Sequence, residues 1–191
     1  SDVLPFSAFG VYEIKVAPSN NNKLFMAYRG SVYRSADKGA HWTKTKLTGK
    51  PYSGGTNMMD ANAQSNGTNL VVRVRPHKMG IDPANEDVVY QGVPGEGVFM
   101  TNDGGESPWT KISALPVPID QGYTGILFDK SSGTVSVGGV TKTKTIYIHA
   151  HEFGYYRSTD GGVSWSLISG STRDLYAAAI DASGNLYFSD V

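Results

Sequence analysis

The 191-residue sequence predicts an all-β protein assembled from a repeated four-stranded unit. The chain contains 23 Gly and 11 Tyr, many short runs of β-branched and aromatic residues, and little helical periodicity, which is typical of all-β proteins with many turns. Each of its three Trp residues closes a similar segment: SADKGAHW, TNDGGESPW and STDGGVSW. One segment recurring at the same place in a strand pattern predicts a repeat protein.

The repeated unit contains four strand signals in a constant order. KMGIDPANE supplies a first strand that ends in a turn, DVVYQG a second strand and GVFMTN a third, and WTKIS is a short fourth strand that starts at the Trp. The flanking units show the same order, with the period-2 alternation of half-buried strands. We expect complete units at about 11–47, 78–113 and 123–168, and a half unit at 174–191.

Four-stranded antiparallel sheets at this spacing predict a β-propeller, whose sheets, called blades, pack face to face around a central channel. About three and a half blades are present in a single partial propeller spanning 1–191. A leucine-rich solenoid is disfavoured, because the repeat is too long and no regular Leu pattern accompanies it.

Composition excludes several classes of partner and chemistry. The formal net charge is zero and the isoelectric point is about 6.9, so nothing indicates a nucleic-acid partner. The longest apolar runs are strand-sized, so we expect no membrane partner. The chain has no Cys, which excludes disulfides and thiolate chemistry. We expect no cofactor.

The Trp-closing segment has a structural interpretation. Asp37 follows the third strand and can accept hydrogen bonds from the backbone of its own turn. Gly39 permits a positive φ where the chain reverses, and Ser35 can hydrogen-bond locally. Trp42 starts the fourth strand, and we expect its ring, like the other two Trp rings, to be buried between blades. A catalytic role for the aspartates of these segments is disfavoured.

The pattern Ser/Thr-x-Asp-x-Gly-x-x-Trp resembles the Asp box, also called the BNR repeat, which occurs in propellers of unrelated function. Its residues here are Ser35, Asp37, Gly39, Trp42, Thr101, Asp103, Gly105, Trp109, Ser158, Asp160, Gly162 and Trp165. The flanks MGIDPANEDVVYQGVPGEGVFMTNDGGESPWTKI and TKTIYIHAHEFGYYRSTDGGVSWSLI are similar to blades of glycoside hydrolase family 74. That resemblance implies an extracellular, secreted propeller that acts on xyloglucan and related β-glucans, often as one half of a two-propeller enzyme.

The catalytic carboxylates of family 74 have no recognisable counterpart here. One of them ends an Ala-Arg-Thr-Asp-type strand, where this chain has Tyr28-Arg29-Gly30, and the other comes from the second propeller. Sialidase activity is disfavoured, since no Arg-Ile-Pro motif or arginine triad is present. The catalytic residues therefore stay unknown. Two hypotheses remain: a fragment of a xyloglucan-degrading hydrolase that contributes sugar-binding loops, or a non-catalytic Asp-box propeller that binds protein or glycan.

Candidate ligand contacts follow from propeller topology. Turns between the second and third strands, and connections between blades, lie opposite the Asp boxes, on the side where propeller ligands usually bind. The long segment 48–77 is either functional or a packing loop. Its Arg75 and His77 line the channel, are solvated or form structural salt bridges. The candidates are Tyr52, Asn57, Asp60, Arg75, His77, Tyr123, His151 and Glu152. With all Trp in Asp boxes, the aromatic platforms left are tyrosines such as Tyr52, Tyr123 and Tyr155.

Two further groups of side chains could carry chemistry. His149 and His151 are spaced as one strand face requires, but a closed zinc site needs more ligands, so we expect no metal and a polar channel lining. A hydrolase needs two carboxylates at a defined separation. Those expected on the ligand side are Asp60, Glu96, Asp120, Glu152 and Asp174.

Partners follow from the fold and the resemblance. We expect an oligo- or polysaccharide ligand. An open arc of blades would expose the apolar faces of its terminal blades and an unpaired edge strand. We therefore expect a homodimer, or a complementary propeller fragment that supplies the remaining blades.

Overall fold

The computed structural model describes residues 11, 13–28, 30–49, 79–93, 95–118, 123–171 and 178–188. This part of the chain forms three four-stranded antiparallel sheets and one two-stranded sheet. Blade 1 comprises β1 (Glu13–Ala17), β2 (Asn20–Tyr28), β3 (Ser31–Ser35) and β4 (Thr43–Lys44). Blade 2 comprises β5 (Met79–Ile81), β6 (Val89–Val93), β7 (Gly97–Thr101) and β8 (Thr110–Lys111).

Blade 3 comprises β9 (Tyr123–Val137), β10 (Val140–Ala150), β11 (Gly154–Ser158) and β12 (Ser166–Leu167). The half blade comprises β13 (Ala178–Ile180) and β14 (Leu186–Phe188). The described sheets run over residues 13–44, 79–111, 123–167 and 178–188. None of the described segments forms a helix that is long and apolar enough to span a membrane.

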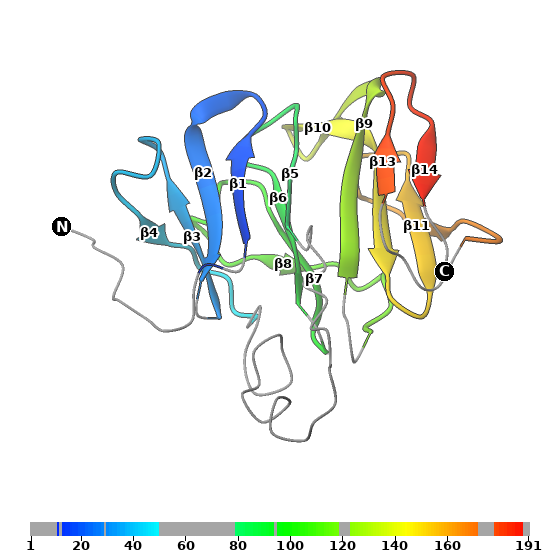
Figure 1. Ribbon diagram of the computed structural model, residues 1–191, viewed down its shortest axis with the longest axis horizontal. Coiled ribbons are helices and arrows are strands. Elements are labelled where there is room, and N and C mark those ends of the chain that lie inside the picture. The colour runs from blue at the N-terminus through cyan, green and yellow to red at the C-terminus, as the bar shows by residue number, and fades with distance from the viewer. Residues whose placement is uncertain are drawn as a thin grey trace, which may run out of the picture.

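The sheets are arranged as the blades of a propeller. Within each sheet the strands follow one another in chain order. Between sheets, β1 contacts β5, β5 contacts β9 and β9 contacts β13. Neighbouring blades therefore meet along their first strands, as blades do around a central axis. Figure 1 shows them side by side, from blue blade 1 on the left to the red half blade on the right.

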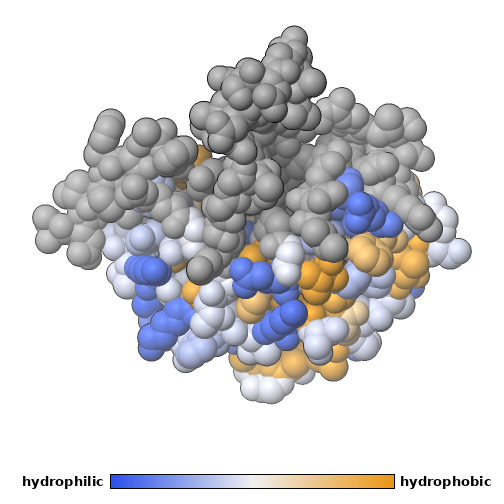
Figure 2. All heavy atoms as spheres, turned by 90° about the horizontal axis from the view of Figure 1, so that it is seen from below, coloured by the Kyte–Doolittle hydropathy of each residue, from blue (hydrophilic) through white to orange (hydrophobic). Residues whose placement is uncertain are grey.

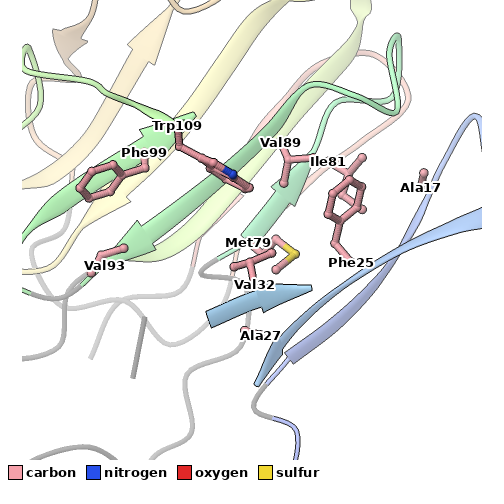
Figure 3. Close-up of a cluster of buried hydrophobic side chains, with 10 residues drawn as sticks. All are labelled: Ala17, Phe25, Ala27, Val32, Met79, Ile81, Val89, Val93, Phe99 and Trp109. Atoms are coloured by element: carbon pink, nitrogen blue, oxygen red, sulfur yellow. The ribbon is translucent and has the colours of Figure 1, made fainter. Parts of the chain in front are cut away.

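The hydrophobic core lies between the blades. Blades 1 and 2 share one cluster of buried side chains (Figure 3): Ala17, Phe25, Ala27, Val32, Met79, Ile81, Val89, Val93, Phe99 and Trp109. A second cluster joins blades 2 and 3, and a third joins blade 3 to the half blade. Val89 belongs to the first cluster, while Val88 and Tyr90 belong to the second. Successive side chains of a strand point to opposite faces of the sheet. Blade 2, which lies between blades 1 and 3, is therefore apolar on both faces.

The hairpin of blade 3 is longer than expected. KSSG, at residues 130–133, is rich in turn-forming residues and directly follows the strand signal TGILFD. Ser131 does donate its N–H and its hydroxyl to Asp129 Oδ1, at 2.9 and 2.6 Å. The chain nevertheless stays extended, and β9 and β10 pair again from Thr134–Thr143 to Val137–Val140. The local Asx turn therefore makes only an irregularity in the ladder, because the pairing resumes beyond it.

Candidate functional site

The three Asp-box segments adopt one hydrogen-bonded turn. In the middle copy, the Thr101 hydroxyl donates to Asp103 Oδ1 at 2.7 Å and accepts from the Gly105 N–H at 3.0 Å. Asp103 also accepts the N–H groups of Glu106 and Ser107, at 3.0 and 2.9 Å. The third copy repeats the scheme with Ser in place of Thr. In the first copy, Ser35 and the His41 N–H bond Asp37 in the same way, but the Ala40 N–H donates to the Asp37 carbonyl instead of the carboxylate. The Asp and the hydroxyl residue thus serve the backbone of their own turn.

These hydrogen bonds fix the charge of the aspartates. The backbone and side-chain hydrogen bonds from His41 lower the pKa of Asp37 to about 2. Burial opposes the shift at Asp103, but hydrogen bonds from Ser107 and Thr101 outweigh it and lower that pKa to about 2. Hydrogen bonds from Ser164 lower the pKa of Asp160 to about 2. Carboxyls that stay ionised at neutral pH cannot act there as general acids.

A cavity of about 310 Å³ lies beside the Asp box of blade 1. Its lining includes the cationic side chains of Lys23 and Arg34 and the imidazole of His41. Each faces a carboxylate. Lys23 pairs with Asp87 of blade 2, Arg34 Nη1 lies 2.8 Å from Glu106 Oε1 of blade 2, and His41 Nδ1 lies 2.5 Å from Asp37 Oδ2. Because these charges compensate one another and two of the pairs join blades, the cavity is better explained as part of the blade junction than as a ligand site.

The three Trp rings differ in burial. Trp109 is 5 % exposed, whereas Trp42 and Trp165 are only half-buried. The expectation of three buried rings therefore holds for Trp109 alone. Blade 2 lies between two blades, and the position of Gly105, whose added Cβ would lie 2.6 Å from Thr45, shows how closely its Asp box packs on blade 1. No described sheet covers the outward face of blade 1, so Trp42 lacks an equivalent neighbour.

The opposite side of the blades carries the turns between second and third strands. Two of these turns are equivalent by register, because Val93 pairs with Gly97 in blade 2 and Ala150 pairs with Gly154 in blade 3. The same backbone hydrogen bond closes both turns. The Glu96 N–H donates to the Val93 carbonyl, and the Phe153 N–H donates to the Ala150 carbonyl, each at 3.1 Å. They lie on the lower side of the molecule in Figure 1. Figure 2 views the molecule from below and shows hydrophobic residues gathered beside hydrophilic ones.

The turn of blade 3 presents two different side chains to solvent. Glu152 is exposed, and its φ of 69° lies in the left-handed region that non-glycine residues rarely adopt. Phe153 is 42 % exposed. Sequence reasoning named Glu152 but missed Phe153, since only tyrosines were considered as platforms. An aromatic residue directly before the Gly that opens a third strand was the available signal.

The neighbouring aromatic and imidazole groups are buried. Tyr155 is 0 % exposed, and its ring centroid lies 4.8 Å from that of His149 and 5.5 Å from that of Phe188. Tyr155 is therefore a core residue, and the idea that it forms a sugar platform is wrong. His151 is 6 % exposed and is not retained as a ligand contact. The described part of the chain holds no group of three or more His, Cys, Asp or Glu that could bind a metal ion.

The remaining candidates cannot be placed at the site. Tyr123 begins β9, and the structure gives no description of its side chain. Glu96 is half-buried in the equivalent turn of blade 2. The following candidates lie outside the described residues: Tyr52, Asn57, Asp60, Arg75, His77, Asp120 and Asp174. Of the ligand-side candidates, the structure thus gives Glu152 an exposed position, next to the unforeseen Phe153.

Solved structures of other proteins contain the same arrangement of blades. The chain superimposes on an enzyme of glycoside hydrolase family 74 from Niastella koreensis with a TM-score of 0.68 and 25 % identity, covering 94 % of the chain and 26 % of that enzyme. It also superimposes on the family 74 xyloglucanase of Xanthomonas campestris with a TM-score of 0.69 and 22 % identity, covering 94 % of the chain and 26 % of that protein. The chain resembles part of a family 74 propeller. The all-β propeller fold expected from the sequence is confirmed.

The relatives found by sequence comparison are xyloglucanases as well. The chain is 29 % identical to the xyloglucanase Xgh74A of Acetivibrio thermocellus over 95 % of its length, which is 23 % of that enzyme. It is 32 % identical to a xyloglucanase of a Paenibacillus species over 83 % of the chain and 15 % of the enzyme. A Hypocrea jecorina xyloglucanase is 29 % identical over 86 % of the chain and 18 % of the enzyme. No family model matches the chain. The chain spans less than a quarter of the length of these relatives.

Proposed function

We propose that this chain is the sugar-binding part of a xyloglucan-degrading glycoside hydrolase. The observation that carries the proposal is the similarity to xyloglucanases over 83 to 95 % of the chain, at 29 to 32 % identity. The superposition on family 74 enzymes, which covers 94 % of the chain, supports it. The ligand is a polysaccharide with a β-glucan backbone, and it binds on the side opposite the Asp boxes.

The chain alone is expected to bind without cleaving. Glycoside hydrolysis uses two carboxyl groups roughly 5–10 Å apart, one of them with a raised pKa. The aspartates of the three Asp boxes have pKa values of about 2 and are occupied by their own backbone. The strand end where family 74 enzymes carry one catalytic Asp has Gly30 instead. The catalytic pair therefore belongs to parts of the enzyme beyond these described residues.

The second candidate function is a non-catalytic Asp-box propeller that binds protein or glycan. Gly30 at the strand end favours it, because no acid or base can be assigned from the resemblance. The two functions differ in their ligand. A xyloglucanase fragment binds xyloglucan and β-glucan oligosaccharides, whereas a general binding propeller prefers another glycan or a protein.

An extracellular location accompanies the first function. Xyloglucan is a cell-wall polymer of plants, so an enzyme that degrades it works outside the cell that makes it. Detection of the full-length protein in the culture medium of its source, rather than in the cell pellet, is the expected result. Retention in the cell pellet would contradict the secreted location.

The outward face of blade 1 supports a further partner, either a second copy of the chain or a complementary propeller fragment. By register, Ile14 and Val16 occupy the positions of Met79 and Ile81 in blade 2. Ile14 and Val16 are 52 and 54 % exposed, but Met79 and Ile81 are 1 and 5 % exposed beneath blade 1. A surface with this pattern is suited to packing against another blade. Light scattering tests it: association is expected, and a monodisperse monomer of 20.5 kDa would contradict it.

The proposed function is tested by measuring binding and cleavage together. Isothermal titration of the purified chain with xyloglucan oligosaccharides is expected to give saturable binding, and incubation with xyloglucan is expected to release no reducing ends. A glycan array run in parallel tests the second candidate. Binding confined to glycans without a β-glucan backbone would refute the xyloglucanase assignment, and rapid release of reducing ends would refute the binding-only role.

A further inference from the structure

The equivalent turns of blades 2 and 3 differ at one position that carries a conformational cost. Gly95 occupies the left-handed position in blade 2, with a φ of 72°. Glu152 occupies the same position in blade 3, with a φ of 69°. Glycine adopts this conformation without steric cost, whereas other L-residues are destabilised in it. Blade 3 thus has a glutamate at a position where the equivalent turn of blade 2 has the glycine that this backbone conformation favours.

No local interaction offsets this cost at Glu152. The carboxylate forms no hydrogen bond or ion pair with any described residue, and the side chain is exposed. The turn around it is held firmly. The Tyr155 N–H donates to Ser171 Oγ at 2.9 Å, and a Cβ added at Gly154 would lie 2.5 Å from the same oxygen. Glu152 is therefore presented to solvent from a fixed backbone.

A left-handed φ alone does not identify a site, because Lys38 shares it. Lys38 has a φ of 61° in the Asp box of blade 1, where Gly104 and Gly161 stand in the other two boxes. Lys38 lies on the Asp-box side. Glu152 differs in its surroundings: it lies on the opposite side and next to Phe153, an aromatic residue that is 42 % exposed.

An exposed aromatic residue beside a carboxylate that no described residue pairs with is a suitable surface for a carbohydrate. A sugar ring has apolar C–H faces that pack on an aromatic side chain, and hydroxyls around its edge that donate to carboxylates. Binding sites combine a broad apolar contact with a few fixed polar groups in this way. A hydrogen bond to a charged acceptor is stronger than one between neutral groups.

We propose that Glu152 and Phe153 form a sugar-binding subsite, in which the Phe153 ring stacks on a glucosyl unit and the Glu152 carboxylate accepts hydroxyl hydrogen bonds from the same saccharide. This inference rests on the proposed function for the choice of ligand. Its own content is the assignment of these two residues, and of the left-handed turn as the device that presents them. Glu152 acts here as a binding group, with no proton transfer.

The test uses Glu152→Gly, Phe153→Ala and the matched control Lys38→Gly in the full chain. Binding of a xyloglucan oligosaccharide with a four-glucose backbone is measured by titration calorimetry, and stability is measured by thermal unfolding. Both glycine variants remove one left-handed L-residue, so each is expected to raise Tm by about 1–4 °C. Glu152→Gly is expected to weaken binding by about tenfold, from the loss of a charged acceptor. Lys38→Gly is expected to bind like the unmodified chain.

Phe153→Ala separates the two halves of the subsite. It is expected to weaken binding at least as much as Glu152→Gly while lowering Tm by no more than about 4 °C, because 42 % of the residue is exposed. Unaltered binding by both Glu152→Gly and Phe153→Ala would overturn the subsite and leave the proposed function standing. A Tm decrease in Glu152→Gly would overturn the role of the turn, since the carboxylate would then be structural. An unmodified chain that binds no xyloglucan oligosaccharide would remove the proposed function, and this inference with it.

Discussion

The two sides of the blades differ in how closely their turns repeat from blade to blade. On the Asp-box side, three copies of one turn share the hydrogen bonds between the hydroxyl residue, the Asp and the Gly. Asp37, Asp103 and Asp160 all have a pKa of about 2. On the other side, equivalent turns diverge: Gly95 in blade 2 becomes Glu152 in blade 3. Repetition here marks groups that maintain the fold. On the side opposite the Asp boxes, divergence at an exposed position leaves room for a ligand contact, as proposed for Glu152.

The largest expected effect sharpens the first half of this comparison. Replacing Trp109 by Ala leaves a cavity in the junction of blades 1 and 2, and we expect a loss of about 3–5 kcal/mol in the free energy of unfolding. The half-buried Trp42 is expected to lose clearly less on the same change, about 1–2 kcal/mol. Urea unfolding measures both. Equal losses would show that the two Asp boxes have the same surroundings, contrary to the burial seen here.

The second prediction removes the acceptor of one Asp-box turn. Asp103→Ala leaves the N–H groups of Glu106 and Ser107 without their carboxylate, and we expect a loss of about 1–2 kcal/mol, as for the loss of a helix cap. The exposed Glu106 is a suitable control, because its Ala variant loses only an exposed ion pair with Arg34. A Glu106→Ala loss as large as that of Asp103→Ala would argue against a special role of the Asp.

Acid titration gives a smaller effect with a definite sign. Asp103 and Asp160 have a pKa of about 2 in the folded chain against 3.8 in the unfolded one. The folded state therefore binds fewer protons, and the stabilisation is complete above pH 4 to 5 and lost as pH falls through 3.8 towards 2. Tm is expected to fall in this window. Asp103→Asn, which cannot titrate, is expected to start from a lower Tm and lose less on acidification, and an equal loss would contradict the account.

The smallest expected effect on stability is at Phe153. Its Ala variant is expected to lower the free energy of unfolding by no more than about 1 kcal/mol, because 42 % of the residue is exposed. Only ligand binding should reveal the residue. A loss comparable to that of Trp109→Ala would place Phe153 in the core and remove the contrast between the two sides.

The sequence was informative where the chain repeats itself. Asp37, Asp103 and Asp160 recur with the same neighbours, and strand alternation around them predicted the sheets. Burial was harder to predict, because it depends on which blade lies alongside. Trp42 and Trp109 occupy the same place in the pattern but differ in exposure. The face of blade 2 that carries Trp109 packs on blade 1, whereas no described sheet covers the corresponding face of blade 1.

The candidate site was predictable only in part. Glu152 was identified from its position in a turn between second and third strands. Phe153 was not, because sequence does not show whether an aromatic residue beside a turn packs inward, and Tyr155, two residues later, packs fully into the core. The left-handed φ of Glu152 was also unforeseen, since Gly95 in the equivalent turn is the residue that such geometry usually requires.

The most direct test of the two-sided account is a map of amide chemical shifts during titration with a xyloglucan oligosaccharide. The account predicts shift changes at residues 150–155 and no changes at the Asp boxes, residues 35–42, 101–109 and 158–165. Changes concentrated at the Asp boxes, with residues 150–155 unaffected, would contradict it.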